Sequence, residues 1–418
     1  MISWSDTDEA IREGIRDFID KEIRPNLDAL ESGELPPYDI IRKLWAAFGV
    51  DAMAAEGVKT FLEKERRKAE RIAAGEPKPE KKENAGGSAL PDGAGGMAAV
   101  LVSELAGVSL GTVASMGVSL GMCASTIARK GTLAQKERWL PKLATFEHVG
   151  AWAITEPDAG SDAFGGMQTY VKRDGEDYIL NGRKTFITNG PFADVAIVYA
   201  KLDEGDGADK RGRKVLTFVL DKGMEGYTQG KPFKKMGMMS SPTGELFFDN
   251  VRLTPDRLLG ETEELGGAKD EVKSSFAGER MGVAILALGI INECQRLAVD
   301  YARSRMLWGK PISDFQLIQL KIARMEVARV NVQNMVFSTL EHLQKGKVPS
   351  LAEASAMKLY ASEAATEVAL EAVQLFGGNG YMAEYRVEQL ARDAKSLMIH
   401  AGSNEVQVTH VAKGVLAR

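Results

Sequence analysis

Two segments of the sequence combine apolar residues with turns that are rich in glycine, hydroxyl groups and backbone N–H groups. They are residues 151–162 (AWAITEPDAGSD) and 184–190 (KTFITNG). Gly160 allows the backbone to come close to a ligand, and Ser161 and Asp162 follow at an expected helix or turn start, where unpaired N–H groups favour anions. Such a surface suits a flat, hydrogen-bonding ring system that carries a phosphate tail. An ordinary junction between a strand and a turn has a similar composition and stays an alternative.

The bulk properties narrow the class of protein. At 418 residues the chain is long enough for two or three domains, and its net charge of -5 argues against nucleic-acid binding. The two cysteines, Cys123 and Cys294, lack disulfide or metal-ligand spacing, so we expect buried thiols and no metal site. We find no apolar run of membrane-spanning length, and the N-terminus is too acidic for a signal or transit peptide. We therefore expect a soluble cytoplasmic protein that binds no membrane.

The elements that must position the two segments change character along the chain. From Asp6 to about Phe48, apolar residues recur at helical spacing, with Asp6 or Thr7 as the expected cap and Pro25 and Pro36 as interruptions. Residues 63–71 (EKERRKAER) predict an exposed helix with local ion pairs, and the Pro- and Gly-rich residues up to 96 predict a mobile loop. Residues 97–143 predict helices again.

The middle of the chain predicts a β-domain. Short β-branched or aromatic runs at residues 178–182, 195–200, 215–220 and 246–253 are separated by turn residues. From about Gly266 onward, helical stripes return and predict a bundle of long antiparallel helices. The stripes are Met281, Ala284, Ile285, Leu288 and Ile291; Ile318, Ile322, Met325 and Val332; and Leu370, Val373 and Phe376, the last ending at the glycines of residues 377–380.

Six segments resemble landmarks of the acyl-CoA dehydrogenase family, and they occur in the family's order. Besides the two segments above, they are residues 139–145 (WLPKLAT), 305–316 (RMLWGKPISDFQ), 374–380 (QLFGGNG) and 392–395 (RDAK). The resemblance implies an α+β fold: an N-terminal helical domain (1–148), a middle β-barrel or sandwich domain (149–258) and a C-terminal four-helix-bundle domain (259–418). Residues 57–96 depart from the family, which usually has a short connection there.

By this resemblance the chain binds FAD. Trp152, Ile154, Thr155, Phe186 and Thr188 are expected against the isoalloxazine, with Phe186 standing where the family usually has Trp. The remaining residues expected at the cofactor are Gly160, Ser161, Trp308 (usually Phe), Ser403 and Glu405, and a set that reaches the FAD of a neighbouring subunit: Arg305, Gln316, Gln374, Gly377 and Gly378. Sharing of FAD between subunits implies an oligomer, and we expect a homotetramer.

The implied reaction removes two hydrogens beside the carbonyl of an acyl-CoA thioester. A carboxylate base takes the α-proton, and the β-hydrogen leaves as a hydride to the flavin. Many family members carry the base in a Glu-Gly-Thr segment, but here Ala401 occupies its place, and alanine accepts no proton. A subset, which includes isovaleryl-CoA dehydrogenase, carries the glutamate on a bundle helix instead. Glu279 matches that position and is the expected base; a solvent-facing helix glutamate is the alternative.

The same resemblance assigns residues to the acyl-CoA ester. Ser161, Arg280, His400, Ala401, Gly402 and Lys413 are expected to bind it. The N–H of Ala401 can donate to the thioester oxygen, and Gly402 allows close approach of the acyl group. His400 stands as an alternative base, although we expect it to fill the place of an aromatic neighbour of the flavin. Arg280 and Lys413 are expected toward the CoA end.

Three readings follow. The first is an FAD-dependent acyl-CoA dehydrogenase that passes electrons to an electron-transfer flavoprotein. The second keeps the cofactor but changes the chemistry, to an acyl-CoA oxidase or to a base-free enzyme of the desulfinase type. The third is a non-catalytic subunit that shares FAD with an active relative. The acyl group itself is left open by the sequence.

Overall fold

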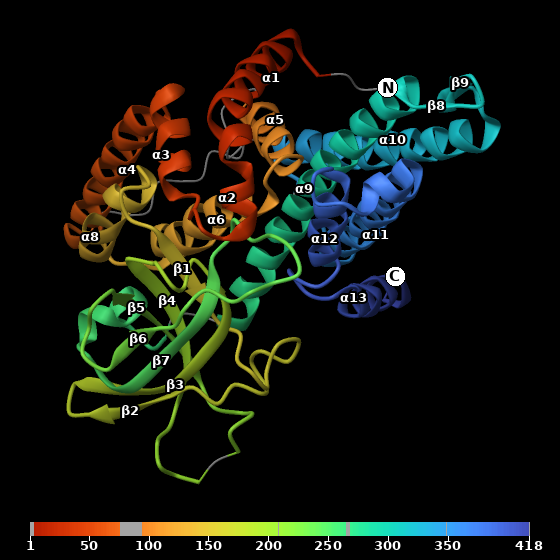
Figure 1. Ribbon diagram of the computed structural model, residues 1–418. Coiled ribbons are helices and arrows are strands. Elements are labelled where there is room, and N and C mark those ends of the chain that lie inside the picture. Colours follow the sequence, from red (N-terminus) through yellow and green to blue (C-terminus); the bar gives the residue numbers. More distant parts are fainter. Residues whose placement is uncertain (1–3, 76–93, 208, 265–267, 348, 418) are drawn as a thin grey trace.

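A computed structural model describes residues 4–75, 94–207, 209–264, 268–347 and 349–417 (Figure 1). The chain folds as helices, then a sheet, then helices, which is the architecture that the sequence predicts. The segment around residues 76–93, expected to be a Gly-rich loop, lies outside the described residues, so that expectation stays a prediction.

The N-terminal region is built from helices whose ends follow local sequence signals. α1 begins after Ser5, whose Oγ accepts a hydrogen bond from the N–H of Asp8, so the expected caps Asp6 and Thr7 are wrong by one or two positions. The Asp8 carboxylate bonds back to the N–H of Ser5 and completes a capping box. The helices are α1 (Asp6–Phe18), α2 (Leu27–Ser32), α3 (Tyr38–Ala47), α4 (Val50–Ala73), α5 (Ala94–Ala106), α6 (Leu110–Met116), α7 (Ser125–Lys130) and α8 (Leu133–Ala144), with short π or 3-10 segments η1 (Ile19–Ile23), η2 (Arg24–Asn26) and η3 (Gly117–Ala124).

The charged helix expected near residues 63–71 is the second half of α4, and α4 packs against α8. Two ion pairs join them: Lys136 Nζ lies 2.6 Å from a Glu65 carboxylate oxygen, and Arg66 Nε lies 2.6 Å from Glu137 Oε1. Val58 and Phe61 of α4 pack against the apolar cluster that holds Trp139 and Leu140 of α8. The helix is therefore docked along one face rather than fully solvated.

The middle region is one curled seven-stranded sheet. Its strands are β1 (Gly150–Ala153), β2 (Tyr170–Asp174), β3 (Asp177–Thr188), β4 (Val195–Leu202), β5 (Val215–Asp221), β6 (Tyr227–Gln229) and β7 (Thr243–Leu253). Neighbours follow the order β1-β4-β2-β3-β7-β6, and β5 pairs with the other side of β4. β4 is buried along its whole length. The β3–β7 pairing shifts register between Lys184 and Ile187, and this bulge lies inside the segment 184–190.

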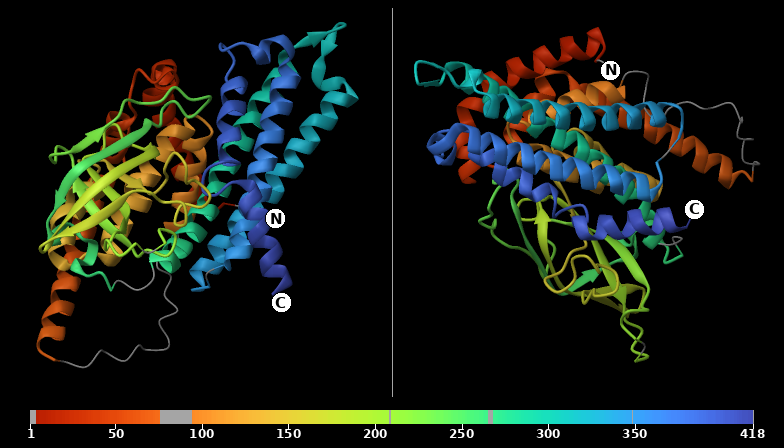
Figure 2. Two further views of the ribbon diagram at one scale, coloured as in Figure 1. Left: turned by 90° about the horizontal axis from the view of Figure 1, so that it is seen from below. Right: turned by 90° about the vertical axis from the view of Figure 1, so that its right-hand side faces the viewer.

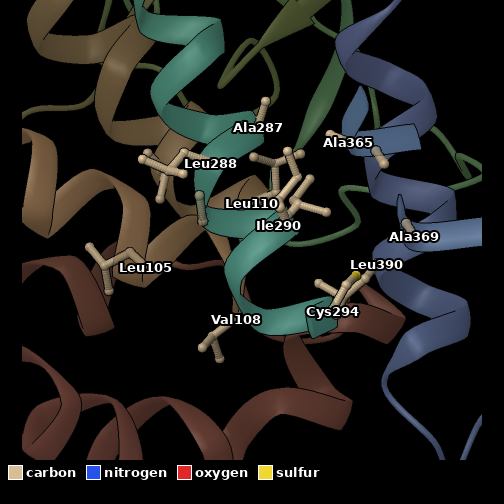
Figure 3. Packing of buried hydrophobic residues seen from close by; sticks show 14 of the residues in the cluster. Leu105, Val108, Leu110, Ala287, Leu288, Ile290, Cys294, Ala365, Ala369 and Leu390 are labelled. Atoms are coloured by element: carbon tan, nitrogen blue, oxygen red, sulfur yellow. The ribbon is translucent and has the colours of Figure 1, made fainter. Parts of the chain in front are cut away.

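The C-terminal region is a helical bundle centred on α9 (Ala268–Ser304). Around it lie α10 (Gln316–Gln344), α11 (Leu351–Phe376), α12 (Val387–Leu397) and α13 (Asn404–Leu416). The hairpin β8 (Met306–Leu307) and β9 (Lys310–Pro311) follows α9, and η4 (Pro255–Arg257), η5 (Leu259–Glu261), η6 (Ile312–Asp314) and η7 (Gly377–Tyr381) are 3-10 turns. Figure 3 shows Ala287, Leu288 and Ile290 of α9 packed with Leu105 of the N-terminal helices and Ala365 of α11. One core thus joins both helical regions.

The cysteines and two apolar stretches of this core can be compared with what the sequence predicts. Cys123 and Cys294 are buried free thiols, as predicted, and burial raises the pKa of Cys123 to about 12. Leu370, expected in a core stripe, is 56% exposed, because the buried face of α11 passes through Ala369 and Ala372 instead. The expectation that no apolar run reaches membrane-spanning length is wrong, because the helical stretches Leu110–Lys130 and Gly278–Ser304 are long and apolar enough to span a membrane. In this fold, 61% of the most apolar part of the first stretch and 50% of that of the second are buried in the protein.

Candidate active site

A buried ion pair joins the two segments 151–162 and 184–190. Lys184 Nζ lies 2.8 Å from Glu156 Oε1 and 3.2 Å from the Ile154 carbonyl oxygen, and the Lys184 side chain is 0% exposed. The Glu156 carboxylate also accepts the N–H of Gln168 at 2.6 Å and of Thr169 at 3.0 Å. These contacts, with a backbone bond from Thr185 N–H to the Thr155 carbonyl at 2.9 Å, hold segments 151–162 and 184–190 together.

Phe186 is presented outward by the bulge in β3. Its φ is 56°, in the left-handed region that disfavours a bulky residue, and its side chain is 67% exposed. Its ring meets Phe233 edge-on, with centroids 5.8 Å apart. A strained, exposed aromatic ring fits an aromatic ligand better than it fits a packing role.

The rest of the two segments shows a mixture of buried and open residues. Ile154 is buried, whereas Trp152, Thr155 and Thr188 are half-buried and Ser161 is exposed. Trp152 packs edge-on against Tyr199, with centroids 5.1 Å apart. A Cβ built on Gly160 would meet nothing within 4 Å, so the space beside its backbone is open to a ligand.

Behind the second segment, Asn189 fixes the turn. Its φ is 64°, and its fully buried amide donates to the carbonyls of Ser115 and Gly150 at 3.0 and 2.9 Å. Tyr38 OH donates to Asn189 Oδ1 at 3.2 Å. One side chain therefore ties the second segment to the N-terminal helices and to β1.

Glu279 and Arg280 lie near the beginning of α9, close to the turn at residues 401–402. A Cβ built on Gly402 would lie 3.8 Å from Arg280 Nη2, and Lys358, whose Nζ donates to the Gly402 carbonyl at 2.9 Å, acts electrostatically on Glu279. The two candidate positions for the base, 122 residues apart in the sequence, therefore lie in the same part of the bundle. Burial raises the pKa of Glu279 to about 7, against the opposing charges of Arg280 and Lys358. A carboxyl with a raised pKa is a better proton acceptor at neutral pH than an ordinary glutamate.

The turn itself is unusual. Ala401 and Gly402 both have positive φ, 57° and 81°, and a Cβ on Gly402 would lie 2.6 Å from Gln407 Nε2. Gln407 Nε2 donates to the Ala401 and Gly402 carbonyls at 3.1 and 2.7 Å, and Lys358 Nζ donates to the Gly402 carbonyl at 2.9 Å. The side chains of two helices therefore fix the backbone of the turn.

The other residues expected near this turn differ in burial and in pKa. His400 is half-buried, and burial together with the charge of Lys358 lowers its pKa to about 4. Ser403 lies at the N-terminus of α13. Glu405 is exposed, and bonds from its own backbone N–H and from Ser403 lower its pKa. Lys413 is exposed on α13.

The other cofactor residues expected from the sequence gather at the opposite end of the bundle. Arg305 follows α9, Trp308 (φ 49°, 85% exposed) forms the turn of hairpin β8–β9, and Gln316 begins α10. Gln374 and the exposed Gly377 and Gly378 belong to this end too, because Phe376 stacks on Tyr301 of α9 at 4.0 Å. The 25 helical steps of α9 from Glu279 to Ser304 place this end of the bundle roughly 37 Å from Glu279, at about 1.5 Å per step.

Figures 1 and 2 show hairpin β8–β9 projecting from the end of the bundle that lies away from the sheet. One chain therefore does not bring Arg305, Trp308 and Gln316 to the surface that carries Phe186.

Sequence reasoning missed several residues of this site. The sequence pattern marks Lys184 and Glu156 only as members of the two segments, and it does not distinguish Lys358, Asn404 or Gln407 from their neighbours. Thr155 and Thr185 pair across 30 residues, and Lys358 reaches Gly402 across 44. The one signal available was the presence of charged residues inside strongly apolar runs, as at Lys358 in the run SAMKLYA. In the described part of the chain, no cluster of three or more metal-ligating side chains is found.

The chain thus combines an N-terminal helical region, a curled sheet that exposes Phe186, and a C-terminal helical bundle that carries a carboxyl of raised pKa. Three family models match in order: the acyl-CoA dehydrogenase N-terminal domain (residues 50–147), middle domain (151–251) and C-terminal domain (270–416). The chain belongs to the acyl-CoA dehydrogenase family. It is an oxidoreductase that acts on acyl-CoA thioesters.

Similar proteins support this assignment over the whole chain. A mitochondrial isovaleryl-CoA dehydrogenase of Oryza sativa is 32% identical over 410 residues, which cover 97% of this chain and 90% of that protein. Butyryl-CoA dehydrogenase of Megasphaera elsdenii is similar in structure, with a TM-score of 0.80, 32% identity and 100% of both chains covered. A chain from a structure of the electron-transferring flavoprotein of Acidaminococcus fermentans matches with a TM-score of 0.80, 30% identity and 100% of both chains covered.

Proposed function

We propose that the protein binds FAD and dehydrogenates an acyl-CoA thioester to the 2-enoyl-CoA, with Glu279 as the base that takes the α-proton. The observation that carries this proposal is that Arg280, the neighbour of Glu279, reaches the turn at Ala401–Gly402, and that Lys358 both contacts this turn and acts on the Glu279 carboxyl. Ala401 removes the carboxylate from one of the two positions, and Glu279 on α9 supplies a carboxyl with a pKa of about 7. His400, with its pKa held near 4, is a far weaker base at neutral pH.

The surface around Phe186 fits a flavin ring. It offers an exposed aromatic face, the half-buried hydroxyl residues Thr155 and Thr188, and open backbone at Gly160. FAD, when bound there, supplies a two-electron acceptor for the hydride that leaves the β-carbon. Glu279 holds the α-proton, and the backbone N–H of Ala401 donates to the thioester oxygen, where negative charge develops. Arg280, a buried guanidinium beside Glu279, keeps positive charge near the ionised carboxylate.

We further propose a homotetramer in which FAD is shared between subunits and an electron-transfer flavoprotein takes the electrons. The length of α9 supports sharing, because roughly 37 Å of helix separate Glu279 from the end of the bundle that carries Arg305, Trp308 and Gln316. Arg305, Trp308 and Gln316 then serve the flavin of a neighbouring subunit. The exposed apolar side chains at this end, which include Met306, Leu307 and Trp308, agree with a covered surface.

Anaerobic mixing tests this proposal. The purified yellow protein is mixed with straight, branched, cyclic and aromatic acyl-CoA esters while the flavin absorbance is followed. We expect one class of ester to bleach the flavin and an electron-transfer flavoprotein to restore the colour faster than oxygen does. Faster restoration by oxygen establishes an oxidase. A yellow protein that no ester bleaches indicates base-free chemistry, and a colourless protein indicates a subunit that needs an active relative to hold FAD.

A further inference from the structure

Lys358 is a lysine inside the helical bundle. It lies on α11, its relative exposure is 0%, and its Nζ donates to the Gly402 carbonyl at 2.9 Å and to Asn404 Oδ1 at 2.8 Å. A buried ammonium group is costly, and an apolar side chain of similar length at this position would avoid the desolvation. The fold alone therefore does not require a charge at position 358.

The contacts of Lys358 all lead to the turn at residues 401–402. Asn404, which Lys358 contacts, also accepts from Ser362 Oγ at 3.1 Å. Gln407 Nε2, on α13, donates to the Ala401 and Gly402 carbonyls of the same turn. Among the residues that the structure describes, neither Asn404 Nδ2 nor Gln407 Oε1 has a hydrogen-bond partner. The Asn404 amide thus turns its oxygen to Lys358 and the Gln407 amide turns its nitrogen to the turn, while the other polar atom of each amide has no hydrogen bond.

The charged groups around Lys358 lie on three helices. Glu279 and Arg280 on α9, Glu363 on α11 and Glu405 on α13 all act on it, and burial lowers its pKa to about 8. The ammonium group remains largely protonated at neutral pH. Lys358 in turn favours the ionised form of Glu279 and opposes protonation of His400. One cation therefore acts on both titratable groups nearest the proposed reaction.

We propose that Lys358 is a positioning residue for the dehydrogenation: it holds the Ala401–Gly402 turn in its left-handed conformation and keeps positive charge beside the Glu279 carboxylate. The proposal rests on the function proposed above. Its two parts are separable, because Gln407 holds the same turn through an uncharged amide. A change at Gln407 alters the turn alone, whereas a change at Lys358 alters both the turn and the field at Glu279.

The test is stopped-flow bleaching of the flavin in the FAD-loaded, full-length protein, with butyryl-CoA and isovaleryl-CoA as probes over a range of pH. Lys358→Met is compared with Gln407→Leu and with Lys345→Met, which removes the same charge from an exposed ion pair at the C-terminal end of α10. In Lys358→Met we expect a shift in the pH midpoint, the pH at which the limiting rate of bleaching reaches half of its maximum. It should rise by about one unit, since a nearby cation lowers a carboxyl pKa by at least that much. We also expect the half-saturating ester concentration to rise about tenfold.

The controls separate the two parts. Gln407→Leu should raise the half-saturating concentration without moving the pH midpoint, and Lys345→Met should change neither. If Lys358→Met does not fold, Lys358→Gln removes the charge and keeps one donor, so its pH midpoint should still move. An unchanged pH midpoint in the Lys358 variants overturns the electrostatic part, and an unchanged ester dependence in Lys358→Met and Gln407→Leu overturns the positional part. Wild-type protein that no ester bleaches contradicts the proposed function instead.

Discussion

The ammonium group of Lys184 and the carboxylate of Glu156 form a fully buried ion pair, with Nζ 2.8 Å from Oε1. The pair joins β3 to the segment that follows β1, and so joins the two halves of the proposed flavin surface. Burial lowers the pKa of Lys184 to about 8, against the attraction of Glu156. Loss of either partner leaves an uncompensated charge in the interior.

Lys184→Met should destabilise the protein strongly and weaken flavin binding. Removing one partner of a buried pair costs about 3–5 kcal/mol of unfolding free energy. The measurement is chemical denaturation, together with flavin release on dilution. Lys184→Met/Glu156→Gln, which removes both charges, should recover part of the loss, and Lys345→Met at an exposed pair should cost less than about 1 kcal/mol. A Lys184→Met protein as stable as the Lys345→Met control would contradict this account.

Phe186→Gly should separate flavin binding from stability. Glycine relieves the positive φ of 56°, so the flavin-free protein should be at least as stable as the wild type. The lost aromatic face should weaken FAD binding by about 1–2 kcal/mol, or roughly 5–30-fold in Kd. Titration of the flavin-free proteins with FAD measures this. Phe247→Ala, at a partly exposed aromatic of the same sheet, is the control and should bind FAD normally. Equal FAD affinity in both variants removes Phe186 from the flavin surface.

Arg305 provides a test of sharing between subunits. Arg305→Ala and Glu279→Gln should each lose most of the ester-dependent bleaching when expressed alone. Co-expression should restore part of it, because a site with Glu279 from one subunit can then take Arg305 from its neighbour. If each site were built within one chain, the mixture would show only the average of the two variants.

The pH dependence of stability gives an independent measure of the burial of Glu279. The pKa of Glu279 is raised from 4.5 to about 7 in the folded protein, so its contribution to stability is complete below pH 4.5 and is lost as the pH rises through 7. The loss amounts to about 3 kcal/mol at about 1.4 kcal/mol per pH unit. Glu279→Gln should therefore gain stability relative to the wild type between about pH 5 and pH 8.

Denaturation at those two pH values measures the difference. Glu31, whose pKa burial and Asp393 raise to about 7, titrates in both proteins and cancels in the comparison. An unchanged difference between the two proteins at both pH values would show that the Glu279 carboxyl is well solvated.

The order of domains could be predicted because hydrophobic periodicity changes from helical to alternating and back, and this signal is local. The residues around Phe186 and Glu279 also lie in local motifs. The hydrogen bonds from Lys358 and Gln407 to the Gly402 carbonyl could not be predicted, because they depend on how α11 and α13 pack. Leu370 shows the same limit: a three-residue stripe does not say which face of α11 meets the core. The cap Ser5 was readable, since Asp8 follows it at capping-box spacing.

The central claim is that Glu279 takes the α-proton. The most direct measurement is a single anaerobic turnover with the ester that bleaches the wild type, compared between Glu279→Gln and Glu176→Gln, which removes the same charge at an exposed hairpin turn. The account predicts that Glu279→Gln remains yellow and reduces its flavin at least about 100-fold more slowly, the usual contribution of a general base, whereas Glu176→Gln bleaches as the wild type does. Bleaching of Glu279→Gln at the wild-type rate would contradict the claim.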